Sequence, residues 1–223
     1  MENVIDLIRR KDLKYDAKKV NADNVEIQYM YAKMYFNGDG VEVNYEEGIK
    51  WLNIAAENGH GEAQCHLGAC YYNGEKLERD YNKAVELFTM AKENKNPLAY
   101  VCLGLAYLEG NGVKKKNRKK AYEYFKKAHK LAEPIGTYRL ANCYYIGIGV
   151  EKNLLKALNY YEKAIKNGYT DDIKIFLLCL KESVDKFESF KNEIKDGDGA
   201  EFRDFFELNK KITVFSDFVE LLK

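Results

Sequence analysis

The sequence predicts an all-α protein that is built as an array of helix–loop–helix repeats with capping helices at both ends. A loop that opens on glycine recurs every 36 or 37 residues. Apolar residues are spaced three and four apart on both sides of each loop, which is typical of amphipathic helices. The chain has only two prolines among its 223 residues, which favours long helices over a turn-rich sheet protein.

Each of the four copies carries small residues at equivalent places. The glycine that opens the loop is Gly38, Gly74, Gly110 or Gly147. The small residue that follows the loop is Gly48, Ala84, Ala121 or Ala157. The alanine seven residues later is Ala55, Ala91, Ala128 or Ala164. Small side chains let two helix backbones approach closely, so each copy predicts one packed helical hairpin.

The four copies are expected at residues 25–60, 61–96, 97–133 and 134–169. Pro97 and Pro134 begin the third and fourth copies, where a proline fits the first turn of a helix. Asn44 and Asp80 lie shortly before two of the second helices and can cap their free amide groups. The second copy has Lys76 where the other loops have a second glycine, so we expect its loop to take a different shape.

The flanking segments do not follow the repeat. We expect residues 1–24 to form an N-terminal capping helix. Residues 170–195 predict a degenerate fifth repeat, with a buried first helix at its start and a second helix around Phe187 and Phe190. Residues 196–223 are rich in apolar groups and predict a C-terminal helical segment, which either caps the array or lies in its groove.

The composition restricts the class of partner and the compartment. Thirty-six Lys and Arg residues oppose 35 Asp and Glu residues, and the net charge of +1 argues against nucleic acid as a partner. No stretch of eighteen apolar residues is present, so no membrane partner is expected. The five cysteines form an odd number and no export signal is visible, which favours free buried thiols in the cytoplasm.

The pattern resembles the Sel-one-like repeat, a relative of the tetratricopeptide repeat, over residues 25–169. The matching residues of the first copy are Ala32, Tyr35, Gly38, Gly40, Val41, Gly48, Trp51, Ala55, Ala56 and Gly59. Those of the fourth copy are Leu140, Tyr144, Gly147, Gly149, Val150, Lys156, Ala157, Lys163, Ala164 and Gly168. The resemblance implies a right-handed α-solenoid (an α/α superhelix) that binds other proteins, often as an adaptor, and it implies no catalysis.

In related helical-repeat proteins the first helices line the concave surface, so the partner-binding residues are expected there. The first row is Phe36, Tyr72, Leu108 and Tyr145, and we expect it to line the groove. The second row is Tyr29, Cys65, Val101 and Tyr138. The third row is Lys33, Ala69, Leu105 and Asn142. Whether the second and third rows line the groove or the core between repeats stays open. Polar residues at the edges include Asn37 and Asn73.

Other constellations point only weakly to chemistry. His66 and Cys102 occupy equivalent positions in adjacent copies, but no third group that would orient a nucleophilic pair is evident. Cys65 and Cys70 lie about 140° apart around a helix, which does not suit one metal ion. The basic run Lys114–Lys120 is expected to be a solvated loop.

The sequence therefore predicts a non-catalytic scaffold or adaptor that binds a peptide or helix of another protein on its concave face. We expect no cofactor, metal or small-molecule substrate. Two alternatives stay open. In the first, the C-terminal segment of the chain fills the groove and regulates access to it. In the second, the chain is an enzyme or a nucleic-acid-binding protein that uses the Lys114–Lys120 run.

Overall fold

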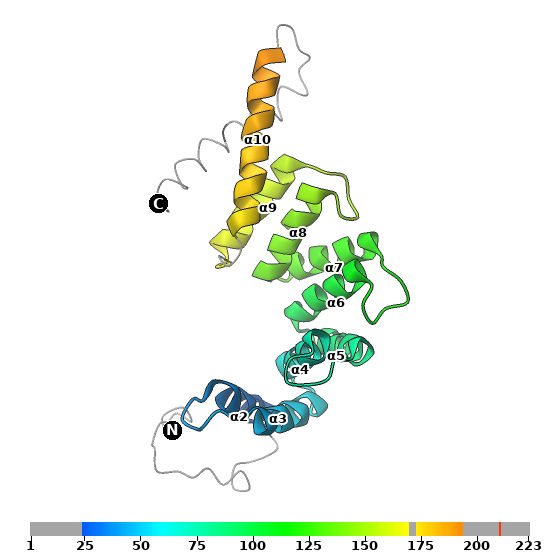
Figure 1. Cartoon of the computed structure of the whole chain (residues 1–223), viewed down its shortest axis with the longest axis vertical. Coiled ribbons are helices and arrows are strands. Elements are labelled where there is room, and N and C mark those ends of the chain that lie inside the picture. Colours follow the sequence, from blue (N-terminus) through cyan, green and yellow to red (C-terminus); the bar gives the residue numbers. More distant parts are fainter. Residues whose placement is uncertain (1–23, 170–172, 194–209, 211–223) are drawn as a thin grey trace. The chain divides into compact units, whose positions relative to one another are not determined.

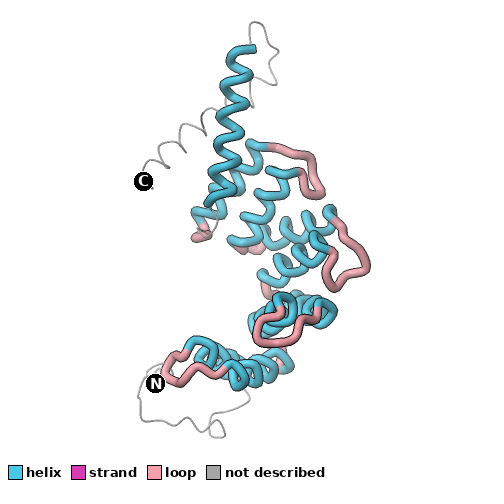
Figure 2. Tube along the Cα trace, in the orientation of Figure 1, coloured by secondary structure: helices cyan, strands magenta, loops and turns pink. Residues whose placement is uncertain are grey.

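The computed structural model of the chain describes residues 24–169, 173–193 and 210. Within these residues the chain consists of helices and loops, and no strand is found there (Figure 1 and Figure 2). Each of α2 to α9 is 13 residues long, and α10 is 21 residues long. The helices are α2 (Val25–Asn37), α3 (Tyr45–Glu57), α4 (Gly61–Asn73), α5 (Tyr81–Glu93), α6 (Pro97–Glu109), α7 (Arg118–Lys130), α8 (Pro134–Ile146), α9 (Leu154–Lys166) and α10 (Ile173–Glu193).

The chain divides into two compact units at Lys116 and Asn117. The described part of the first unit holds α2 to α6, and that of the second unit holds α7 to α10. In the first unit α2 packs on α3 and α4 packs on α5, and each hairpin packs on the helix that follows it. In the second unit α7 packs on α8, α8 on α9 and α9 on α10. This repeated packing confirms the predicted all-α solenoid.

Capping residues fix the ends of the helices. The first helix of each repeat (α2, α4, α6 or α8) ends at a glycine with φ between 72° and 88°, a left-handed conformation that favours glycine. The second helix of each repeat (α3, α5, α7 or α9) begins after a residue whose side-chain oxygen accepts a hydrogen bond from a first-turn amide. These caps are Asn44, Asp80, Asn117 and Asn153.

The loop of the second repeat differs from our expectation. Lys76 adopts φ 66°, the same value as Gly112 and within a few degrees of Gly149 at φ 69°, which occupy this position in later loops. The expected difference in loop shape is therefore wrong, because the lysine takes the left-handed conformation at a cost of about 1 kcal/mol. Its ammonium group lies 4.8 Å from the ring centroid of Tyr45 and 5.6 Å from that of Phe36, which offsets part of this cost.

The expected fifth repeat is present only as its first helix. α10 packs on α9, where the rings of Phe176 and Tyr161 lie 5.9 Å apart. It then continues without a break to Glu193, through the position at which the earlier copies have their loop glycine. Ser183 occupies this position and is fully buried, and its hydroxyl donates to the Cys179 carbonyl. A separate second helix around Phe187 and Phe190 therefore does not form.

The other flanking predictions concern residues that the structure does not describe. The capping helix expected over residues 1–24 lies outside the described residues except for Asn24, whose side chain caps α2. The segment expected over residues 196–223 lies outside them except for Lys210. Both predictions stay open.

Candidate functional site

One accessible stripe runs along each first helix of the first unit. Its positions are spaced four, three and four residues apart, so they share one helix face. All of its residues are exposed or half-buried. We call this surface the first-helix stripe, and it comprises Glu26, Met30, Lys33 and Asn37 on α2, Glu62, His66, Ala69 and Asn73 on α4, and Leu98, Cys102, Leu105 and Glu109 on α6.

The second predicted row belongs to the core. Cys65, Val101 and Tyr138 are 2 to 3% exposed, and only Tyr29 is half-buried. Burial, together with nearby Glu62, raises the pKa of Tyr29 to about 12. The sequence leaves open whether this row lines the groove or the core between repeats. The structure places three of its four residues in the core, so a partner cannot reach Tyr138.

The third predicted row is accessible in the first unit and interrupted in the second. Lys33 is exposed, and Ala69 and Leu105 are half-buried. Asn142 is buried on α8, and its side-chain oxygen accepts a hydrogen bond of 2.5 Å from the Tyr161 hydroxyl. This row therefore offers contact residues on α2, α4 and α6, whereas Asn142 joins α8 to α9.

The first predicted row is half-buried because most of its rings connect successive repeats. Phe36 packs on Gly48 in its own hairpin, and its ring lies 5.0 Å from that of His66 in the next repeat. Tyr72 donates to Glu109 Oε2 at 2.5 Å and accepts a bond of 3.2 Å from Asn111. Burial and the bond to Glu109 raise the pKa of Tyr72.

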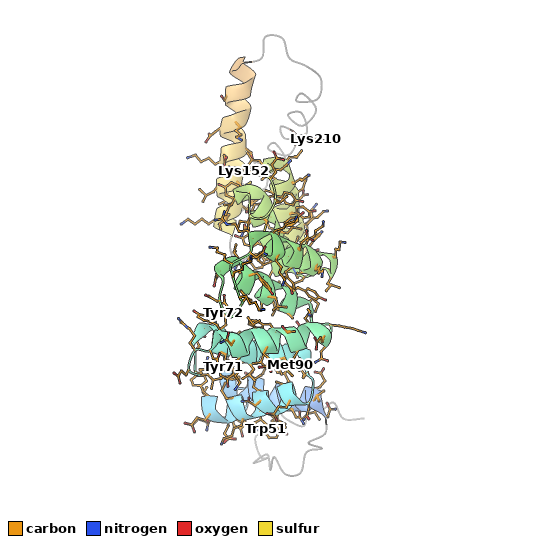
Figure 3. The ribbon with its side chains drawn as sticks, turned by 90° about the vertical axis from the view of Figure 1, so that its right-hand side faces the viewer. Trp51, Tyr71, Tyr72, Met90, Lys152 and Lys210 are labelled. Atoms are coloured by element: carbon orange, nitrogen blue, oxygen red, sulfur yellow. The ribbon has the colours of Figure 1, made fainter. Side chains whose placement is uncertain are left out.

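Tyr145 repeats this arrangement in the second unit. It lies 37 positions before Glu182 of α10, the same separation as between Tyr72 and Glu109. Lys152 bridges the two, because its ammonium group lies 2.7 Å from Glu182 and 5.4 Å from the Tyr145 ring. Figure 3 labels Tyr72 and Lys152 on the ribbon. The fourth member of the row, Leu108, is half-buried. The row therefore has a structural role whether or not it also contacts a partner.

The predicted edge residues brace their own loops. Asn37 donates to Asp39 at 3.2 Å, and Asn73 donates to Glu75 at 3.5 Å. Both asparagines are exposed, so they remain available at the ends of the first-helix stripe.

The predicted rows did not include the second position of the stripe, which holds Met30, His66 and Cys102. A stripe spaced four, three and four residues apart is visible in the sequence, but these three side chains share neither size nor polarity. The ring of His66 packs near Tyr29 and Phe36. Burial and the nearby Lys76 lower its pKa, so His66 is neutral at pH 7.

Several groups that suggest chemistry have structural roles. His60 caps α4, because its Nδ1 accepts from the Ala63 amide at 3.2 Å while its Nε2 lies 3.2 Å from Glu26. Burial raises the pKa of the Cys143 and Cys179 thiols to about 12, which keeps both protonated and poorly reactive. Across the described part of the chain, no three His, Cys, Asp or Glu side chains are grouped so that they could hold a metal ion.

The basic run joins the end of the first unit to the start of the second. All of its lysines and Arg118 are exposed, and Asn117 within it caps α7 by accepting from the Lys120 amide at 2.9 Å. Its arrangement is that of a solvated connection and helix cap. Among the described helices, none has the length and apolar character needed to cross a membrane.

Comparisons with known proteins agree with this architecture. The Sel1 repeat family matches residues 25–60, 61–96, 97–131 and 134–169. No curated protein matches the chain. Among solved structures, a Sel1 repeat protein from Oxalobacter formigenes is 29% identical with a TM-score of 0.62, and the match covers 69% of this chain and 63% of that one.

A second solved structure supports the fold alone. It is c5321, a protective antigen of uropathogenic Escherichia coli with an SLR fold, at 24% identity and a TM-score of 0.60. This match covers 86% of the present chain and 38% of c5321, so the chain spans less than two thirds of either solved protein. The four family matches cover more than half of the chain and begin where α2, α4, α6 and α8 begin. The chain belongs to the Sel1 repeat family.

Proposed function

We propose that the chain is a non-catalytic scaffold that binds an extended segment or a helix of another protein on the first-helix stripe. Sel1 repeat proteins generally act as protein-interaction scaffolds. The observation that carries the proposal is the stripe itself, which recurs at the repeat spacing on α2, α4 and α6. Its middle is largely apolar and all its ends except Leu98 are polar, a distribution that suits a segment with alternating apolar contacts and polar flanks.

The chemistry of the stripe favours recognition over catalysis. Its titratable residues are spread along three helices, and the nearest candidate for acid–base work, His66, packs against aromatic rings. A nucleophilic site would need a base and an orienting group within hydrogen-bond reach. Met30, Ala69 and Leu105 instead offer an apolar strip that can bury partner side chains.

The experiment changes two residues of the stripe and leaves the aromatic residues that connect successive repeats unchanged. Ala69→Glu with Leu105→Glu places charge on the half-buried stripe. The matched control is Ile54→Glu with Met90→Glu on the second helices, where both side chains are exposed. Proteins bound by each full-length variant are quantified after cross-linking and mass spectrometry. We expect loss of partner with the stripe variant alone, together with cross-links at Lys33. Equal binding by both variants contradicts the proposal.

A further inference from the structure

The second helices carry opposite charge in the two units. In the first unit α3 has three Glu residues and one Lys residue, and α5 has two of each sign, so their formal net charge is −2. In the second unit α7 has six Lys and Arg residues and one Glu, and α9 has three Lys residues and one Glu, giving +7. A chain of nearly neutral total charge therefore concentrates positive charge on α7 and α9.

Tyrosine rings hold part of this positive charge in place. The Tyr122 and Tyr144 hydroxyls lie 2.9 Å apart, and the Tyr144 ring stacks on Tyr160 with centroids 5.5 Å apart and planes 7° apart. An ammonium group lies over each ring, at 5.7 Å for Lys126 over Tyr122, 5.6 Å for Lys156 over Tyr144 and 5.5 Å for Lys163 over Tyr160. We call these six residues the lysine–tyrosine face.

The face includes an open pocket. Its volume is ≈ 550 Å³, and it is lined by Tyr144, Lys156, Asn159, Tyr160, Glu162, Lys163 and Lys166. Glu162 in this pocket is paired with Lys166 at 2.7 Å. Burial raises the pKa of Tyr160, so its hydroxyl stays protonated and can donate a hydrogen bond. The pocket thus combines ammonium groups, a phenol and an amide, all of which can donate to carboxylate oxygens.

We propose that the lysine–tyrosine face binds a carboxylate-rich segment of a partner protein. Charge complementarity carries the choice of occupant, because an acidic segment can neutralise the excess of lysines on α7 and α9. The rings restrict Lys156 and Lys163 before binding, which lowers the side-chain entropy that contact would cost. This surface uses α7, α9 and the end of α8, whereas the proposed scaffold function rests on α2, α4 and α6, so each proposal can fail alone.

Two features favour an acidic protein segment over nucleic acid. Proteins that bind single strands offer aromatic rings on which bases stack. Here Tyr144 and Tyr160 stack on each other and carry lysines, so their rings are already engaged. Glu162 also places a carboxylate in the pocket, where its charge would oppose a row of phosphates.

The test measures fluorescence anisotropy with the full-length chain and a labelled peptide of alternating Glu and Gly. A Gln–Gly peptide of equal length and an oligothymidylate serve as comparison probes. The test variant is Lys156→Gln with Lys163→Gln. The control is Lys114→Gln with Lys115→Gln, which removes the same charge from exposed positions of the first unit. Lys156→Arg with Lys163→Arg restores the charge, and circular dichroism confirms that all variants keep their helices.

We expect the wild type to bind the Glu–Gly peptide and not the Gln–Gly peptide. The test variant should bind at least about tenfold more weakly, as expected for loss of close charge pairs, while the control and the arginine variant bind within about twofold of wild type. Equal weakening in test and control would show attraction by net charge alone and overturn the proposal. No binding by wild type, or tighter binding of the oligothymidylate through the same lysines, would also overturn it.

Discussion

The first unit joins the two helices of a hairpin through buried amide pairs. Gln64 is 1% exposed, and it accepts a hydrogen bond of 2.9 Å from Asn94 while donating one of 2.9 Å to the Ala56 carbonyl. One repeat earlier, Gln28 accepts the equivalent hydrogen bond of 3.0 Å from Asn58. The two pairs lie one repeat apart, so the first unit uses the same polar device twice.

The second unit places different chemistry at the equivalent position. Thr137 stands where α2 and α4 have Gln28 and Gln64. Its hydroxyl donates a hydrogen bond of 3.0 Å to the Glu133 carbonyl and also lies 3.0 Å from His129 Nδ1. The backbone of the repeat is nevertheless unchanged, since caps and small residues determine it. Polar core positions and surface charge can therefore change independently of the helical frame.

The largest expected effect concerns alkaline pH, and the two thiols that we test for it lie in the second unit. Burial raises the pKa of Cys143 and Cys179 from 9.0 to about 12. A raised folded pKa means that the stabilisation is complete below pH 9 and is lost as pH rises from 9 to 12. Each thiol then contributes up to about 1.4 kcal/mol of lost stability per pH unit. Urea unfolding of the wild type at increasing pH measures this loss.

The control for the pH effect is a pair of alanine variants. Cys143→Ala with Cys179→Ala should make the pH dependence above pH 9 less steep, because two of the buried groups that ionise there are then removed. Cys102→Ala removes a half-buried thiol of the first unit and serves as the matched substitution control. Parallel curves for all three proteins would contradict the prediction.

The next effect compares the loops of the two units. A Cβ added to Gly149 would overlap the Arg118 carbonyl oxygen, and Gly149 has φ 69°. Gly149→Ala should therefore lower the free energy of unfolding by about 3 kcal/mol, from backbone strain and the overlap together. Lys76→Ala keeps a Cβ at a position that already accepts one, so it should cost less than about 1 kcal/mol. Urea midpoints of the two variants check the difference.

A smaller effect is expected from the buried amide of the first unit. Gln64→Ala removes the partner of the Ala56 carbonyl and of Asn94, so it should destabilise the first unit by about 2 kcal/mol. Thr137→Val in the second unit loses only hydroxyl bonds and should cost about 1 kcal/mol. Thermal unfolding measures both variants, with exposed Asn82→Ala as a control. A smaller loss for Gln64→Ala than for Thr137→Val would reverse the expected ranking.

The repeat and the ends of its helices could be predicted because they depend on local rules. Gly38, Asn44 and the alanines mark helix ends and close approaches directly in the sequence. The shape of the loop at Lys76 could not be predicted, because the neighbouring Tyr45 and Phe36 offset the strain of the lysine. The continuous α10 was missed because Ser183 gives no sign of whether a helix ends there.

The candidate site was predicted less well than the fold. Spacing indicated which residues share a helix face, but a shift of one position decides whether a residue meets a partner or the core. Tyr138 shows this, since it aligns with the half-buried Tyr29 and is itself 3% exposed. Contacts between repeats, such as Tyr72 with Glu109, also depend on a neighbour 37 residues away, which residue type alone does not reveal.

The smallest expected effect compares two tyrosine–glutamate contacts between repeats, Tyr72 with Glu109 in the first unit and Tyr145 with Glu182 in the second. Tyr72→Phe removes both bonds of the hydroxyl but leaves Asn111 donating to Glu109 at 3.0 Å, so it should cost about 1 kcal/mol. Tyr145→Phe should cost less, at most about 0.5 kcal/mol, because Lys152 already pairs with Glu182. The two phenylalanine variants keep the ring and differ from wild type only in the hydroxyl, so urea unfolding reports the hydrogen bond itself. If Tyr145→Phe proves the more costly, the ion pair does not support that joint, and the tyrosine hydroxyl is its main polar contact.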